Sequence, residues 1–474
     1  MKQELTKLAS LRAISMLAVF TFLFLSTEYF YVNQIALQTS STWTVAAQNY
    51  ALGVSAIGFC CYPLLFRFCQ DRLRSAVFFT LTLLAIACFV ILGSHISLVL
   101  LTAAGMLLFL VLGILGSAVH YHFFCEISDK KYLTRMVGIS YAFAVLLQFL
   151  NNSLISSALA EMVLLCAAMI FIVVCLFRSR HREANHSPQM PSAVNSRPQL
   201  ILLILLVILM SCIFSTLDNA ITLGHADGTM DIGQWPRVLL ACSGLAAGFL
   251  FDCHNRRFMN LIMYCIMMLS TLCVAILQLG GSFLIGLIVF YLSSGFFVVF
   301  FTTSFLALSE HTGCPRLWAG MGRAVNNAGA ALVTNLSLSL MASNNSISLI
   351  IAALVLFAAV SILIAAYSTL KEPGVQTETG GAAPGISCDT DYPQGAPDAD
   401  PFSTFSTAFS LTDREQSVFD QLVNTEKSIQ EIADSLFISR RTCQRYITSI
   451  YEKVGAKSRM GLYQSYIEWQ RKNL

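Results

Sequence analysis

The feature that most constrains this chain is a succession of long apolar segments that occupies it up to about residue 370. A helix needs roughly 20 mainly apolar residues to cross a bilayer. Segments of this kind lie near 13–32, 45–66, 75–93, 97–119, 136–157, 161–177, 200–222, 236–252, 258–279, 282–306, 318–341 and 347–369. Only 12% of the residues are charged, against about a quarter in soluble domains. The sequence therefore predicts an all-α protein whose residues 1–370 form a polytopic membrane bundle of twelve transmembrane helices.

The basic residues of this region support the count and predict its orientation. Seventeen of the eighteen Lys and Arg residues before position 370 fall in the N-terminus or after the second, fourth, sixth, eighth and tenth segments, and Arg237 is the exception. Short loops rich in Lys and Arg stay in the cytoplasm. Both termini are therefore expected on the cytoplasmic side. No small-residue cleavage site follows the charged start at Met1–Arg12, so the first segment is expected to be retained.

The remaining side chains give no sign of catalysis. The fifteen cysteines are scattered, apart from Cys60 and Cys61, with no Cys-x-x-Cys pair and no Cys/His cluster at zinc spacing. The sequence also contains no nucleophile–base set and no phosphate-binding loop. We therefore expect no metal, no cofactor and no enzymatic activity.

Two separated points suggest that the twelve segments are two repeats of six. Asp71 and Asp252 are 181 residues apart, and so are Arg135 and Arg316. The run Gly248-x-x-x-Asp252-x-x-x-Arg256-Arg257 resembles the loop motif of major facilitator superfamily transporters, and the first-half copy, with Asp71 and Arg72, is degenerate. The resemblance implies a 6+6 pseudo-symmetric bundle with a central cavity. It also implies a cytoplasmic loop latch made by Asp71, Arg72, Asp252, Arg256 and Arg257.

Polar groups within the apolar segments are candidates for the cavity, because ionisable residues at membrane depth usually face the bundle interior. The candidate ligand residues are Glu28, Asp218, Asn219, Asn151, Asn152, Arg323, Asn326 and Asn327. Three of them, Arg323, Asn326 and Asn327, share one helix face by their spacing. An unpaired Arg is costly there, so we expect Glu28, Asp218 or an anionic ligand to pair with Arg323.

A second interpretation of these residues stays open. Asn side chains also hold membrane helices together, at about 0.6 kcal/mol each on average. Glu28 and Asp218 lie toward the outer ends of their segments, where a carboxylate costs little. These residues then contribute to packing or solvation and bind no ligand.

A polar, acidic segment follows the membrane region. Residues 371–408 contain six acidic residues against one Lys, with Pro, Gly, Ser and Thr, a composition typical of a flexible linker. A chain of this length spans about 35 Å, which is enough to separate the last domain from the bilayer surface.

Residues 409–474 predict a soluble domain of four short helices. Thr412 and Glu415 form a capping-box pattern, and Ser428 and Glu431 repeat it. The pair Phe437–Ile438 is expected at a turn. Ser439 is then expected to begin the third helix and Gly455 to end it, before a fourth helix starts at Ser458.

The third helix separates two kinds of side chain. Cys443, Ile447, Ile450 and Val454 form an apolar stripe, and Arg441, Gln444, Arg445, Thr448 and Glu452 fall on the opposite face. This arrangement suits the major groove of DNA, where Arg bonds to guanine and Gln to adenine. A solvated face of a protein-interaction bundle is the alternative, since the domain has ten basic against eight acidic residues.

The run from Leu411 to Arg459 resembles the LuxR-type (NarL/FixJ-like) helix-turn-helix, with departures at Cys443 and Tyr446. By motif position the resemblance implies base reading by Gln444, Arg445 and Thr448. The expected contacts to phosphates come from Arg440, Arg441, Thr442 and Lys457. The resemblance also implies a homodimer that forms through the helix at 458–470.

Together these features predict a bacterial inner-membrane transcription regulator, multi-pass, with both termini in the cytoplasm. A small molecule of unknown identity would occupy the bundle and change how the C-terminal domain binds double-stranded promoter DNA. The alternative is a major facilitator-type transporter with a regulatory DNA-binding tail.

Overall fold

The structure, a computed structural model, describes most of the chain. The described residues are 2–68, 71–94, 96–127, 130–183, 197–229, 231–342, 346–371, 405–406, 408–409, 411–424, 428–436, 438–456 and 458–473. They belong to two compact units, Met1–Gln376 and Thr377–Leu474. Of the predicted linker at 371–408, only Lys371, Phe405, Ser406 and Ala408 fall among them.

Each apolar segment predicted in the first unit overlaps one long helix, and where a segment extends beyond its helix it does so by at most three residues. The long helices are α1 (Lys2–Ala36), α2 (Ser41–Phe68), α3 (Asp71–Gly93), α4 (Leu98–Glu126), α5 (Leu133–Leu154), α6 (Ala158–Glu183), α7 (Arg197–Ala226), α8 (Pro236–Asp252), α9 (Met259–Gln278), α10 (Phe283–Ser309), α12 (Met321–Ala342) and α13 (Ser346–Lys371). Shorter helical elements are η1 (Lys130–Tyr132), η2 (Cys253–Arg256) and α11 (Pro315–Trp318).

Nine helices in the described ranges are long and apolar enough to cross a membrane, so the chain is a multi-pass membrane protein. The long helices outside this set are α2, α8 and α12. Helix α8 has only 17 residues, and α2 and α12 carry polar side chains that bond across helices. Tyr50 of α2 donates to Asn335 of α12 at 2.8 Å, and Asn327 of α12 donates to Ser55 of α2 at 2.8 Å. The count of twelve spans therefore stays a prediction.

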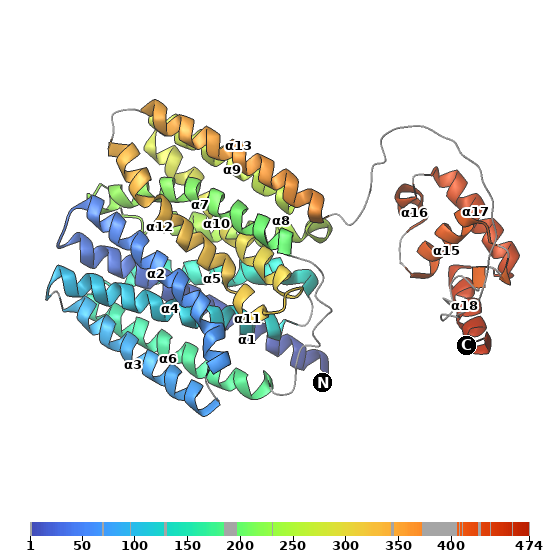
Figure 1. The fold of residues 1–474 in the computed structure, drawn as a ribbon, viewed down its shortest axis with the longest axis horizontal. Coiled ribbons are helices and arrows are strands. Elements are labelled where there is room, and N and C mark those ends of the chain that lie inside the picture. The colour runs from blue at the N-terminus through green and yellow to red at the C-terminus, as the bar shows by residue number, and fades with distance from the viewer. Residues whose placement is uncertain are drawn as a thin grey trace, which may run out of the picture. The chain divides into compact units, whose positions relative to one another are not determined.

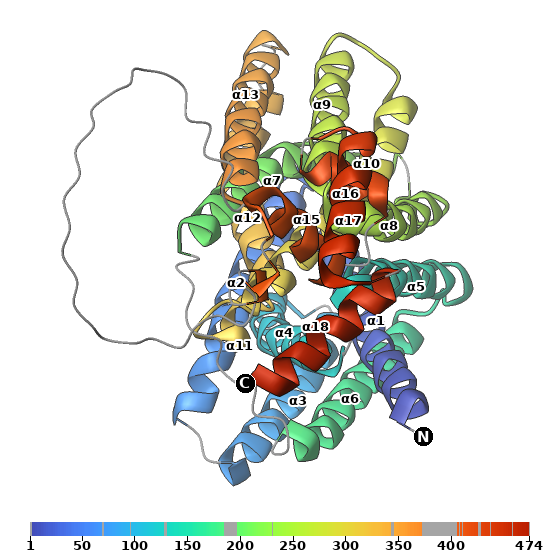
Figure 2. The ribbon, with the colours of Figure 1, turned by 90° about the vertical axis from the view of Figure 1, so that its right-hand side faces the viewer.

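The helices of the first unit pack in two sets that repeat each other. Helix α2 packs on α4 as α8 packs on α10, and α1 packs on α5 as α7 packs on α12. Likewise α3 pairs with α6 and α9 with α13, and these two pairs lie at opposite edges of the bundle (Figures 1 and 2). The sets meet through α5 against α8 and α2 against α12. This recurrence is what a six-helix duplication requires.

Glycines allow the two sets to approach closely where α5 crosses α8. A Cβ on Gly138 of α5 would lie 2.7 Å from the Cα of Gly248 and 2.8 Å from the carbonyl oxygen of Gly244, both in α8. Backbone atoms cannot move aside as a flexible side chain does. Small residues at such crossings bring helix backbones together in membranes. The α5–α8 contact therefore depends on residues without side chains.

In the second unit, the described helices match the four predicted ones. They are α15 (Asp413–Asn424), α16 (Ile429–Ser435), α17 (Arg440–Val454) and α18 (Arg459–Asn473). Ser428 and Glu431 form the predicted capping box at α16, and the Ser439 hydroxyl accepts from the Thr442 N–H at the start of α17. Gly455 ends α17 with a φ of 75°, in the left-handed region that favours glycine.

An aromatic cluster anchors the N-terminal edge of this unit. The Phe405 side chain is fully buried and its ring contacts those of Phe419 in α15 and Tyr466 in α18 at centroid distances of 5.1 Å, with Trp469 at 5.4 Å. Aromatic pairs at such distances add to the burial of apolar area. Phe405 lies in the segment predicted as linker, yet its side chain belongs to the core of the second unit.

Replacing Phe405 tests this anchoring. Phe405→Ala in a 401–474 fragment should lower the free energy of unfolding by about 3–5 kcal/mol, because it leaves a cavity among large rings. Urea unfolding measures the change. Arg414→Ala, at an exposed position of α15, is the matched control and should change stability little. Equal effects of the two substitutions would contradict a core role for Phe405.

Candidate ligand cavity and nucleic-acid interface

A polar cavity of about 150 Å³ lies inside the membrane unit. Four helices each contribute one charged side chain to its lining, and they come from both helix sets: Glu28 of α1, Asp218 of α7, Arg237 of α8 and Arg323 of α12. Asn326 and Asn327 of α12 also line it. The structure thus brings together five of the eight residues predicted for the ligand site.

Of the partners expected for Arg323, neither Glu28 nor Asp218 forms an ion pair with it, and pairing with an anionic ligand stays a prediction. Within the described residues Arg323 makes no hydrogen bond or ion pair, and its guanidinium lies between two rings, 5.5 Å from the centroid of Phe24 and 5.5 Å from that of Phe301. Glu28 instead accepts a hydrogen bond from Gln48 Nε2 at 2.7 Å. Cation–π contact partly compensates the buried cation but leaves its N–H donors unused.

Three predicted asparagines lie outside the cavity lining, because they hold neighbouring elements together. Asn219 accepts from Asn49 at 2.8 Å and donates to Ser337 at 3.2 Å. Asn151 of α5 donates to Glu161 of α6 at 3.2 Å, and Asn152 donates to the carbonyl of Gly233, in the connection between α7 and α8, at 3.2 Å. For these three, the interhelical packing interpretation describes the structure.

Sequence reasoning missed several lining residues. They are Arg237, Gln48, Tyr29, Tyr141 and Tyr291. A signal existed for Arg237, since it was the one basic residue that broke the alternation of charged loops. The tyrosines and Gln48 carried no such signal, because residues of these types occur elsewhere in the apolar segments.

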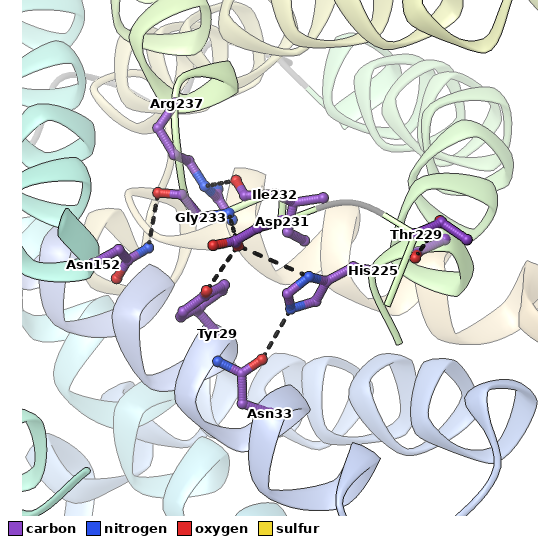
Figure 3. Close-up of polar contacts among 10 residues, drawn as sticks. Tyr29, Asn33, Asn152, His225, Thr229, Asp231, Ile232, Gly233 and Arg237 are labelled. Carbon is purple, nitrogen blue, oxygen red and sulfur yellow. Dashed lines mark hydrogen bonds and ion pairs between the residues drawn. The ribbon is translucent and has the colours of Figure 1, made fainter. Parts of the chain in front are cut away.

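One end of the bundle is crossed by the connection between α7 and α8, at 227–235, and we call it the loop end. Here Asp231 Oδ1 accepts from the hydroxyl of Tyr29 at 2.9 Å and from the Gly233 N–H at 2.8 Å. His225 Nδ1 lies 3.9 Å from the same oxygen, and its Nε2 is 2.9 Å from Asn33 Oδ1. Figure 3 shows how these contacts join the connection to α1.

The loop-end contacts also hold Arg237 in place. Its Nε donates to the Ile232 carbonyl at 3.1 Å (Figure 3), and its guanidinium faces the ring of Tyr291 at 6.0 Å. Although burial opposes ionisation, hydrogen bonds from Gly233 and Tyr29 lower the pKa of Asp231. The connection therefore fixes both an anion and a cation beside the cavity.

The opposite end, where α5 begins and α8 ends, is called the latch end. The buried Asp252 carboxylate accepts from the Arg135 N–H at 2.9 Å, in the first turn of α5. An anion there satisfies an orphan donor and complements the helix dipole. Arg256, with a φ of 66°, donates to the Lys130 carbonyl at 3.2 Å. These contacts join the two helix sets, and a latch function for them stays a prediction.

The other predicted latch residues take no described part in these contacts. Arg257 is exposed. The side chains of Asp71 and Arg72, at the start of α3, lie outside the described part of the chain.

In the second unit, α17 presents one polar face. Gln444, Arg445 and Thr448 are exposed beside Arg441 and Glu452. On the opposite side Cys443, Ile447 and Ile450 are buried in the core. The predicted separation of the two faces is confirmed, and the predicted base-reading residues lie together on the outer one.

The residues predicted to contact phosphates lie near the start of α17. Arg440 and Arg441 are exposed. Thr442 is half-buried, and its hydroxyl is 2.8 Å from that of Ser439. Lys457 lies outside the described residues.

Glu415 fixes α17 against α15. Its Oε2 accepts from the Thr412 N–H at 2.8 Å, as the capping box requires, and also from Lys453 Nζ at 2.6 Å. Its Oε1 accepts from the Ser449 hydroxyl at 2.6 Å. Burial alone would raise the pKa of this carboxyl, but the bonds from Lys453, Ser449 and Thr412 outweigh it and lower the pKa to about 2. The sequence predicted the cap but not this contact with α17.

The lowered pKa makes a testable contribution to stability. Because the folded-state pKa lies below the ordinary value of 4.5, the contribution is fully present above about pH 4.5 and is lost as the pH falls towards 2. Glu415→Gln should remove at most about 3 kcal/mol at neutral pH, and the difference from wild type should shrink between pH 4.5 and 2. Urea unfolding across this range measures it, with exposed Glu452→Gln as the control. A difference that does not change with pH would contradict the assignment.

Comparison with known proteins agrees with the geometry of the second unit. Residues 409–466 match the family described as bacterial regulatory proteins, luxR family. Over 49 residues, 10% of this chain, the sequence is 45% identical to the spore germination protein GerE of Bacillus subtilis (strain 168). The match spans 65% of the length of that protein.

The membrane unit resembles solved transporters. The crystal structure of an auto-inhibited POT family peptide transporter superposes with a TM-score of 0.52 and 12% identity, over 79% of this chain and 99% of the other. A bacterial homologue of the iron transporter ferroportin, in an outward-facing state, gives a TM-score of 0.52 and 14% identity, over 76% and 99%. Such identities show the fold alone. The chain therefore joins a helix-turn-helix domain that matches the luxR family over residues 409–466 to a multi-pass membrane region that shares the fold of these two transporters.

Proposed function

We propose that this protein is a transcription regulator of the bacterial inner membrane that senses a small molecule in its bundle and binds promoter DNA with its C-terminal domain. The observation that carries the proposal is the exposed face of α17, with Gln444, Arg445 and Thr448, in the same chain as a charged membrane cavity. Arg and Gln on a helix packed from behind are suited to base edges in the major groove. The basic residues at the latch end favour a cytoplasmic location for that end and for both termini.

In this proposal the ligand acts by shifting the bundle between two packings. A ligand does so only if it binds the two states differently. The cavity meets this condition in principle, because its charged residues come from both helix sets. Movement of one set against the other would change the distances among these groups. The change would reach the DNA through the predicted linker at 371–408.

The DNA-binding form is proposed to be a homodimer through the helix at 458–470. The Tyr463 side chain on α18 is 45% exposed, whereas Tyr466 on the same helix is buried in the unit's own core. Arg459 bonds to the Leu422 carbonyl at 2.8 Å and fixes the start of α18 against the end of α15. A fixed helix with an exposed aromatic residue is a suitable surface for a second copy.

A second function, that of a transporter with a regulatory DNA-binding tail, is favoured by the fold of the membrane unit and by its charged central cavity. Uptake distinguishes the two. If the protein is a regulator, a compound that binds it should enter vesicles that contain the full chain no faster than it enters empty vesicles. Accumulation above that level would support the transporter.

The exposed face of α17 yields a prediction about DNA binding. Selection from random DNA with the 401–474 fragment should enrich one sequence, and Arg445→Ala should weaken its binding about 5–150-fold, the cost of one bidentate contact to a base. Arg414→Ala removes the same charge from an exposed position of α15 and should change the affinity much less. Retention of both affinity and sequence preference by Arg445→Ala would sink the assignment.

The cavity yields a second prediction, for the full chain. A reporter driven by the selected sequence should respond to growth conditions in wild-type cells, and Arg323→Met should blunt that response because the cavity loses its unpaired cation. The amount of the variant in the membrane and its basal reporter activity should match wild type, which would place the defect in sensing. Arg67→Met, at an exposed position of α2, is the control. An Arg323→Met reporter that follows wild type in every condition would count against the sensor.

A further inference from the structure

The charged groups of the cavity are balanced but not paired. Two carboxylates, Glu28 and Asp218, face two guanidinium groups, Arg237 and Arg323. In the part of the chain that the structure describes, none of these four forms an ion pair with nitrogen and oxygen within 4.0 Å. Charged groups away from water require a partner, so the lining offers both signs of charge to a ligand.

These charges are separated along the bundle. Arg323 is the third residue of α12 and lies at the latch-end side of the cavity, beside Phe24 of α1. Glu28 lies one turn further along α1, about 6 Å closer to the loop end. Because they are four residues apart, Phe24 and Glu28 point from the same face of α1.

The loop-end side of the cavity carries the other charges. Asp218 is eight residues before the end of α7, and Arg237 is the second residue of α8. Arg237 is already committed to the Ile232 carbonyl and to the ring of Tyr291. Counted as ionised groups, Glu28, Asp218 and Arg237 give this side a formal charge of −1, and Arg323 gives its side a formal charge of +1.

The two ends also have open hydrogen-bonding capacity. Arg323 makes no hydrogen bond within the described residues, and its planar fork matches a carboxylate or another oxyanion in bidentate fashion. Asp218 likewise makes none there, and one turn away the buried hydroxyl of Thr222 has no partner. An ammonium group can donate to both. The ring of Phe214, which also lines the cavity, favours a cation in the same place.

We propose that the cavity binds a small zwitterion, with an ammonium group toward Asp218 and Glu28 and a carboxylate or similar acid group toward Arg323. A ligand with one charge leaves the opposite end unpaired, and an uncharged ligand leaves both ends unpaired. Only a molecule with both charges, a few bonds apart, compensates the two ends together. The inference rests on the proposed role of the cavity as the ligand site, and it names the class of ligand.

The test uses matched compounds and the full chain in lipid nanodiscs. Each set contains a zwitterion and its two singly charged counterparts: phenylalanine with phenethylamine and 3-phenylpropanoate, and 4-aminobutyrate with butylamine and butyrate. Thermal unfolding is followed for each compound at the same concentration. In at least one set the zwitterion should raise Tm by several degrees more than either counterpart. The proposal is overturned if no zwitterion exceeds its counterparts, which includes the result that no compound shifts Tm.

Variants assign the two ends. In Arg323→Met, the zwitterion should raise Tm only as much as the amine does. In Asp218→Asn, it should raise Tm only as much as the acid does. Arg67→Met should leave the preference intact. Arg323→Lys keeps the charge and should keep a weakened preference, which provides a second measurement if the methionine variant does not fold. An unchanged preference in the variants of both ends would also overturn the proposal.

These readouts separate the ligand class from the sensor function, because no DNA is present in them. If zwitterions bind and the reporter ignores them, the sensor proposal fails and the ligand class stands. If the reporter responds only to compounds with a single charge, the sensor proposal stands and the ligand class fails.

Discussion

The cost of placing charge in a low-dielectric bundle is the constraint on which the rest of this structure depends. Glu28, Asp218, Arg237 and Arg323 are each held on a different helix, so the compensation of charge is shared between the two helix sets and is not completed within either one. Desolvation of such groups is expensive unless they are paired. The packing of the two helix sets is therefore expected to depend on the charge of a molecule that occupies the cavity.

The contacts at the two ends of the bundle determine what can move. At the latch end, Asp252 of one helix set caps α5 of the other. At the loop end, Asp231 accepts a hydrogen bond from the hydroxyl of Tyr29. Both are bonds between the two helix sets, and Gly138 and Gly248 allow a close backbone approach of α5 to α8. A packing in which the two sets separate at one end would break the bonds at that end. A ligand that favours such a packing has to outweigh the hydrogen bonds that are broken.

The sequence predicted the elements better than the site. Apolar length, basic loops and the caps at Ser428 and Ser439 are local signals, and the helices, the repeat and the two faces of α17 followed from them. Contacts distant in sequence left no such signal. Asn152 bonds to a loop carbonyl 81 residues away, and Arg323 lies between two rings where a carboxylate was expected. Glu415 was recognised as a cap, but its bonds to Ser449 and Lys453 depend on how α17 packs on α15.

The central claim is that the state of the membrane cavity governs binding of DNA by the same polypeptide. The most direct measurement is the Kd of the full chain in nanodiscs for its selected DNA, compared between wild type and Glu28→Gln, with the isolated 401–474 fragment as reference. The account predicts that the two full-length proteins differ in Kd, although the substitution lies in the membrane unit and leaves the DNA-reading face unchanged. Identical Kd values for wild type, variant and fragment would contradict it.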